Sequence, residues 1–251
     1  MPVRIVNPQA GHGRVDLDDP FPYGYLLLSG HVSPRPPVLP MGRAKRNLFL
    51  RLHGCAEQLR SREDVRHVSL FDALVMPPLG VLPYVRDHRD SVHLARFDVV
   101  ALVETASPQA AREVRDSAPY AALRQELDKD ADDTHELLGR NAKRIAQVGR
   151  DRRGVYIFNH FVGDDPEVVL ELWEHLAAWY VHHTQASNSL MLVPDAGEKA
   201  DYVAVNHGHW DTGVLRLLWR QVSSPGFRGF VQANLAANRT GSMPVFYRLI
   251  A

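Results

Sequence analysis

The segment from residue 201 to residue 213, DYVAVNHGHWDTG, brings several chemically active side chains into a short run. In a strand, alternate residues face opposite sides of a sheet, so His207 and His209 share one face and Asn206 and Trp210 share the other. The two imidazoles could bind one metal ion, but a mononuclear catalytic metal usually has three protein ligands, and only one carboxylate follows close by. Imidazole, amide and indole groups at a strand end can instead hold the oxygens of an aromatic ligand. We therefore expect a substrate pocket and no bound metal here, with a solvated strand end as the alternative.

A predicted amphipathic helix over residues 165–183 supplies a second set of polar groups. Trp173, Tyr180 and His183 lie along its apolar stripe. The Tyr180 hydroxyl and the His183 imidazole need hydrogen-bond partners if they are buried. We weigh two roles for His183, a pocket residue and a satisfied or exposed histidine.

The predicted strand over residues 154–162 places Asn159 and His160 at adjacent positions, so only one of them can face the helices. O₂ attacks a phenolic carbon more easily when the phenol is deprotonated, and a histidine of near-neutral pKa can take that proton. We predict that His160 or His183 is the catalytic base. The predicted substrate-binding residues are Asn206, His209, Trp210, Tyr180 and Trp173.

The composition restricts the class of protein. The chain has 251 residues, with 29 Lys and Arg against 29 Asp and Glu, so no surplus of positive charge favours nucleic acid as a partner. No segment reaches the roughly 20 apolar residues of a membrane span, and residues 1–20 lack the apolar core of a secretory signal. We therefore expect a cytoplasmic protein that binds no membrane. Cys55, the only cysteine, excludes an intramolecular disulfide, and the absence of a Gly-rich phosphate loop disfavours a nucleotide-binding Rossmann domain.

The hydrophobic periodicity predicts the same order of elements twice: strand, helix, strand, strand, helix, strand. In the first half the expected strands are 23–32, 65–75, 96–104 and 143–149, and the helices are 43–60 and 107–127, the second interrupted at Pro119. In the second half the expected strands are 154–162, 188–194, 201–209 and 244–250, and the helices are 165–183 and 214–235. Each half is therefore a predicted split βαβ unit.

A single split βαβ sheet leaves one apolar face bare, and two such sheets in tandem can cover each other. We therefore predict an α+β chain of two tandem ferredoxin-like units that form a fused dimeric α/β barrel. The first unit is residues 1–150, including an N-terminal extension, and the second is residues 151–251.

The two predicted units differ in polar content and in one loop. Residues 97–109 align with residues 201–213 without a gap, yet the first segment is mainly apolar where the second carries Asn206, His207 and His209. We therefore expect the second half alone to hold the pocket. After residue 75, about twenty residues precede the next strand, where a hairpin needs two to five. This stretch is a candidate lid, with a covering or partner-binding loop as the alternative.

A chain of this order, with no cofactor fingerprint and a second half rich in His, Trp and Asn, resembles the dimeric α/β barrel oxygenases of antibiotic biosynthesis. The segments PQAGHGRVDLDDPFPYGYLLLSGHV and FVQANLAANRTGSMPVFYRL are most similar to the anthrone-oxygenase-like, ring-opening oxygenases of angucycline pathways of the jadomycin, gilvocarcin and kinamycin type. The resemblance implies oxidative C–C bond cleavage in ring B of an angucyclinone, an aromatic polyketide. It further implies O₂ and a diffusible reduced flavin, FMNH₂ or FADH₂, supplied by a separate flavin reductase. The sequence is also compatible with a homodimer.

Three alternatives stay open at the level of the sequence. One is a cofactor-independent, anthrone-type monooxygenase that forms a quinone. Another is a haem-binding, chlorite-dismutase-like protein, for which His135, His175, His182 or His183 could be the axial ligand. The last is a non-catalytic small-molecule binder.

Overall fold

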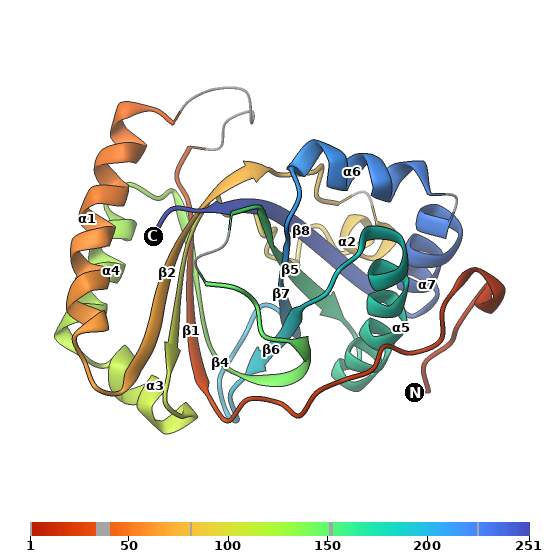
Figure 1. Cartoon of the computed structure of the whole chain (residues 1–251), viewed down its shortest axis with the longest axis horizontal. Coiled ribbons are helices and arrows are strands. Elements are labelled where there is room, and N and C mark those ends of the chain that lie inside the picture. The colour runs from red at the N-terminus through yellow and green to blue at the C-terminus, as the bar shows by residue number, and fades with distance from the viewer. Residues whose placement is uncertain (1, 34–40, 81, 151–152, 225) are drawn as a thin grey trace.

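The structure is a computed structural model that describes residues 2–33, 41–80, 82–150, 153–224 and 226–251. In this part of the chain, eight antiparallel strands close into a barrel in the order β1-β3-β2-β8-β5-β7-β6-β4 (Figure 1). The strands are β1 Gly24–His31, β2 Val65–Val75, β3 Val99–Thr105, β4 Asp133–Ala146, β5 Val155–Gly163, β6 Ser189–Pro194, β7 Ala204–Trp210 and β8 Thr240–Leu249. Closure leaves the sheet without a free edge at which another chain could pair.

Each half of the chain contributes four neighbouring strands in the same relative order. The first half gives β4-β1-β3-β2 and the second gives β8-β5-β7-β6. The halves meet where β2 pairs with β8 and where β4 pairs with β6. Inside the barrel, Tyr25 and Leu27 of β1 belong to the same buried cluster as Tyr156 and Phe158 of β5. The barrel interior is therefore an apolar core shared by both halves.

Helices cover the outer face of the barrel on two sides (Figure 1). They are α1 Arg43–Arg60, α3 Pro108–Arg115 and α4 Ala118–Asp128 in the first half, and α5 Pro166–Thr184, α6 Val214–Ser223, the π-helix η2 Phe227–Gln232 and α7 Ala233–Ala237 in the second. Leu26 and Leu28 of β1 are buried with Leu48 and Leu52 of α1, whereas Leu27 faces the barrel interior. A strand buried on both faces reads as a continuous apolar run, which explains the sequence of β1.

The start of α5 follows the signal in the sequence. The Asp165 side chain accepts hydrogen bonds from the backbone N–H groups of Glu167 and Val168, and Pro166 occupies the first turn. An Asp cap satisfies N–H groups that have no partner within the helix, and proline loses nothing at this position. The predicted helix start is confirmed.

Strand β4 differs most from the prediction. The expected strand was 143–149, whereas β4 runs from Asp133 to Ala146. Leu137 faces the barrel interior, and Leu138 faces the helices of the first half. Glu136, the residue before them, accepts a hydrogen bond from the Tyr120 hydroxyl at 3.0 Å. The charged side chains of β4 have partners in another element, so the alternation of apolar and polar residues that predicts a strand is not visible in the first part of β4.

The two long predicted helices are both interrupted. The break expected near Pro119 is confirmed, since α3 ends at Arg115 and α4 begins at Ala118. The helix predicted over 214–235 is divided into α6, η2 and α7.

Two segments outside the repeated pattern pack on the second half. The N-terminal segment, which contains the 3₁₀ helix η1 Pro8–Ala10, runs along α5 before it enters β1 (Figure 1). The stretch between β2 and β3 contains α2 Pro83–Asp87, and Val85 is buried with Val162 and Met243. None of the helices in the described residues combines the length and the apolarity needed to cross a membrane.

Candidate functional site

A cavity of about 250 Å³ lies between the outer face of the second-half strands and the helices that cover them. Strands β5, β7 and β8 form its floor, and α5, α6 and η2 form its walls. Trp173, Phe161 and Phe246 are among its apolar lining residues, and Pro77 and Leu82 from the stretch after β2 close part of its rim. A concave, mainly apolar space with a few polar groups is typical of a small-molecule site.

The polar part of the floor is built around two asparagines. Asn159 on β5 is the direct cross-strand partner of Asn206 on β7. The Asn159 Oδ1 atom accepts a hydrogen bond from Ser242 Oγ at 2.9 Å, and the Asn206 Oδ1 atom accepts one from Ser189 Oγ at 2.5 Å. Since both oxygens are occupied, the two amide nitrogens are left to donate. No hydrogen bond joins either nitrogen to another described residue, so both can serve an oxygen atom in the cavity.

The helical walls add a hydroxyl group and an indole ring. The Tyr180 hydroxyl accepts a hydrogen bond from Gln221 Nε2 at 3.2 Å, which leaves its own proton free to be donated. Burial raises the pKa of Tyr180, so the hydroxyl is protonated at neutral pH. Trp210 Nε1 donates to Thr184 Oγ1 at 3.0 Å, so the ring of Trp210 lines the cavity while its polar atom is satisfied elsewhere.

The lining is electrically neutral. Among the described residues that line the cavity there is no Asp, Glu, Lys, Arg or His. Hydrogen-bond donors therefore act there without competition from a charged side chain, and in a space with little water they are stronger than at the surface.

The structure brings four of the predicted site residues together in this lining: Asn206, Trp210, Tyr180 and Trp173. Their part in substrate binding stays a prediction. Asn159, which the sequence left as an alternative to His160 for the helix-facing position, is the one that faces the cavity. The sequence gives no signal for Ser189, Ser242 and Gln221, because their role comes only from the side chains that they contact.

The three predicted histidines lie elsewhere. His209 is on the interior face of β7, where its ring packs on Tyr156 at a centroid distance of 4.5 Å and Nε2 lies 3.0 Å from the Arg153 carbonyl. His160 is completely buried on the interior face of β5, beside Phe97 and Tyr202. Burial holds the pKa of His160 well below its usual range, and the nearby His135 lowers it further.

His183 lies at the C-terminal end of α5, away from the cavity lining, where its ring stacks on Trp179 at 4.5 Å. Burial lowers the pKa of His183, and His12 and His182 lower it further. Neither predicted base therefore faces the cavity, because a sequence does not reveal which face of a strand or helix the binding space will occupy.

Several solved structures share the fold of this chain at a low sequence identity. An anthrone oxidase-like protein superposes with a TM-score of 0.60 at 8% identity, over 91% of each chain. A proposed monooxygenase from Fusobacterium nucleatum subsp. nucleatum gives 0.57 at 6% identity, over 91% of this chain and 93% of the other. A proposed chlorite dismutase gives 0.50 at 9% identity, over 91% and 95%. No protein-family model and no curated protein sequence matches the chain.

These superpositions show the fold that the chain shares with monooxygenase-type and chlorite-dismutase-type barrels. Haem, one of the alternatives left open by the sequence, needs an axial ligand, which is a His, Cys, Met or Tyr side chain. No His, Cys or Met is among the described lining of the cavity, and Tyr180, which is there, is held in its protonated form because burial raises its pKa. The histidines considered as axial ligands, His135, His175, His182 and His183, all lie outside it, so the cavity does not fit haem.

Proposed function

We propose that the protein is an oxygenase that acts on a flat, oxygen-bearing aromatic compound bound in the cavity over β5, β7 and β8. One observation carries the proposal: Asn159 and Asn206 present two unpaired amide N–H groups on the floor of a neutral, aromatic-lined cavity. Aromatic walls suit a flat ring system, and two neighbouring donors suit a phenolate or ketone oxygen.

The two amides would act on the charge that develops during the reaction. Deprotonation of a phenol or of an anthrone produces an oxyanion, and this anion transfers electrons to an oxidant more readily than the neutral compound. N–H donors aimed at that oxygen stabilise the anion most when water is excluded. In this proposal no histidine takes the proton: Asn159, Asn206 and the Tyr180 hydroxyl lower the pKa of the bound substrate, and its proton passes to water.

For the particular reaction we propose cleavage of ring B of an angucyclinone with O₂ and reduced flavin. One oxygen atom enters the bond between a ring carbonyl and its neighbour, and the other leaves as water. Reduced flavin would supply the two electrons for this step, and water would then open the ester that has formed. A separate flavin reductase would deliver the flavin as a diffusible cosubstrate. The resemblance of the sequence to the angucycline ring-opening oxygenases motivates this choice.

The neutral lining favours a second candidate, a cofactor-independent oxidation. FMN and FAD carry phosphate groups, which proteins usually bind with Arg, Lys or helix N-termini, and no Arg or Lys is among the described lining residues. An anthrone can reduce O₂ by itself: its CH₂ group becomes a carbonyl, one oxygen atom enters the product and the other leaves as water with both hydrogens.

One experiment separates these candidates. Purified protein is given an anthrone or an angucyclinone in an oxygen electrode, with and without FMN, NADH and a flavin reductase, and products are identified by mass. Uptake that needs the reductase supports the flavin-dependent reaction, and uptake independent of it supports the cofactor-free reaction. Binding of the aromatic compound without any product in either arm would leave a small-molecule binder and refute the oxygenase.

We also infer that the barrel consists of two ferredoxin-like units in tandem, residues 1–150 and 151–251. The identical relative strand order of the two halves supports this inference. In such an arrangement the second unit would carry most of the site, and the first would complete the barrel core and contribute Pro77 and Leu82 to the cavity lining.

A further inference from the structure

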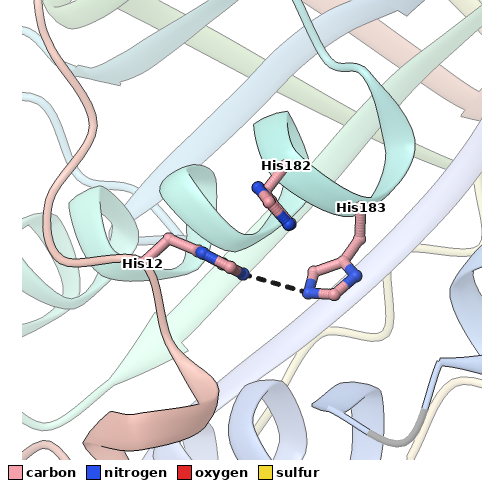
Figure 2. Close-up of side chains that lie close together, drawn as sticks. All are labelled: His12, His182 and His183. Carbon is pink, nitrogen blue, oxygen red and sulfur yellow. Dashed lines mark hydrogen bonds between the residues drawn. The ribbon is translucent and has the colours of Figure 1, made fainter.

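Three histidines from distant parts of the chain meet at the C-terminal end of α5 (Figure 2). His12 comes from the N-terminal segment, and His182 and His183 are in the last turn of α5. Their ligand atoms all lie within 4.8 Å of one another, and among the described residues this is the one such group of His, Cys, Asp or Glu. His12 and His182 are exposed and His183 is partly buried, so ions from solvent can reach the group.

The spacing of the nitrogens is close to that of metal ligands. His12 Nε2 and His183 Nε2 lie 3.1 Å apart. Two nitrogens bound to one tetrahedral Zn²⁺ at 2.0–2.1 Å are about 3.4 Å apart. The ring of His182 stacks on that of His12 at a centroid distance of 3.8 Å, and one of its nitrogens lies within 4.8 Å of the ligand atoms of the other two histidines.

The backbone around His12 is already fixed in place. The backbone N–H of Val15 donates to the Glu174 carbonyl at 3.1 Å, and Arg14 forms ion pairs with Glu171 and Glu174. In addition, the Nδ1 atom of His175 lies 3.1 Å from the Gly13 carbonyl oxygen. These contacts hold the N-terminal segment against α5, so only side-chain rotations are needed to complete a three-imidazole site.

We propose that His12, His182 and His183 bind one divalent late transition-metal ion, with Zn²⁺ as the fitting species. Neutral imidazoles suit Zn²⁺ and its neighbours, and three of them with a solvent-filled fourth position form a familiar coordination shell. The Trp179 ring stacks on His183 at a centroid distance of 4.5 Å and restricts the orientation of that imidazole.

The ion would connect the N-terminal segment to the wall of the cavity. His183 follows Tyr180 by one helical turn, and Tyr180 lines the cavity. On its other side the segment packs tightly on η2: a Cβ atom at Gly11 would lie 2.6 Å from the Phe230 ring. Metal binding therefore clamps α5 and η2 together through the segment that crosses both. This role is independent of the oxygenase proposal.

Binding can be measured on the full-length protein after removal of adventitious metal with EDTA. Titration with Zn²⁺ in a calorimeter should give one site per chain, and Co²⁺ should produce the visible absorption bands of a tetrahedral complex. His12→Ala, His182→Ala and His183→Ala should each weaken Zn²⁺ binding at least about 100-fold, because even loss of an outer-shell partner costs 10–100-fold in metal affinity. His53→Ala, which removes an exposed imidazole from α1, should bind Zn²⁺ like the wild type.

Trypsin cleavage provides a readout that does not depend on the calorimeter. Zn²⁺ should slow cleavage after Arg4 and Arg14 in the wild type and leave the rate unchanged in His12→Ala. Circular dichroism without metal confirms that each variant is folded. The proposal is wrong if wild-type protein shows no saturable Zn²⁺ binding, or if binding survives all three substitutions.

Discussion

Asn159 and Asn206 face each other across two neighbouring antiparallel strands, and each has its amide oxygen held by a serine hydroxyl. Ser242 and Ser189 thereby hold both amide oxygens and leave both amide nitrogens to donate. Two neighbouring donors therefore lie on the neutral floor of the cavity. This arrangement resembles the geometry by which enzymes stabilise an oxyanion, in which the donors are placed before the charge develops.

Replacing either asparagine by leucine should impair turnover while the protein stays folded. Asn206→Leu and Asn159→Leu keep the branched shape of the side chain and remove the donors. Loss of one oxyanion donor typically lowers kcat about 10²-fold or more, and we expect a loss of that order in each variant. The double variant should lose less than the product of the two effects, because both donors serve one oxygen. Steady-state oxygen uptake gives the rates.

The matched control for this pair is Asn47→Leu, the same substitution at an exposed position of α1. Its kcat should equal that of the wild type. If Asn206→Leu behaves like Asn47→Leu, the amides do not stabilise the transition state.

Tyr180→Phe tests the hydroxyl on the cavity wall. A neutral hydrogen bond contributes about 0.5–1.5 kcal/mol, so kcat/KM should fall about two- to tenfold. The thermal stability should change little, since the ring is retained and only the bond from Gln221 is lost. Tyr84→Phe is the control, because its hydroxyl donates to Asp164 outside the cavity lining. Equal kinetics in both variants would remove Tyr180 from the mechanism.

Local patterns in the sequence predict some features of this site, and the other features depend on the pairing of strands that are distant in the sequence. The period-two alternation correctly placed Asn206 and Trp210 on one face of β7 and His207 and His209 on the other, because side-chain direction in a strand depends only on position. It could not reveal which face the cavity occupies. The pairing of Asn159 with Asn206 depends on the register between β5 and β7, and no nearby residue encodes that register.

The histidines show what local sequence patterns cannot predict. His160 and His183 were attractive as bases because of their chemistry, yet one faces the barrel interior and the other the protein surface. The contact between His12 and His183 joins residues 171 positions apart, which no local pattern predicts. Strand β4 was located only at its end, since its charged residues have partners on α4 and the apolar alternation is interrupted.

His160→Leu should retain most of the wild-type turnover. Both ring nitrogens of His160 are buried, and their interaction with the Met243 backbone falls short of hydrogen-bond geometry. Replacing a buried polar group that lacks partners by an apolar one of similar size is close to neutral or stabilising. We therefore expect a kcat within about a factor of two of the wild type and an unchanged or higher melting temperature. A large loss of kcat, with normal folding and normal substrate affinity, would restore His160 as the base.

The stability of the barrel should depend on pH through His207. This residue is buried on the interior face of β7, where its ring stacks on Phe158 at 4.4 Å and Nδ1 lies 3.1 Å from the Ile157 carbonyl. Burial lowers the pKa of His207 to about 4, against about 6.5 in an unfolded chain. Between these values the unfolded chain binds a proton that the folded protein does not, so the free energy of unfolding falls as the pH falls. The difference in pKa corresponds to about 3 kcal/mol, present in full above pH 6.5 and lost near pH 4.

Urea unfolding between pH 7 and pH 4 measures this loss. His207→Phe removes the titrating group and keeps an aromatic ring, so its stability at pH 7 should drop through the lost hydrogen bond while its dependence on pH becomes shallower. His135, whose pKa burial also lowers to about 4, contributes a second part of the slope, so the variant should keep some sensitivity to acid. His53→Phe on the exposed face of α1 should have the wild-type slope. If the free energy of unfolding depends on pH equally in His207→Phe and the wild type, His207 takes up its proton as readily in the folded barrel as in the unfolded chain. Water or another group would then reach it in the barrel.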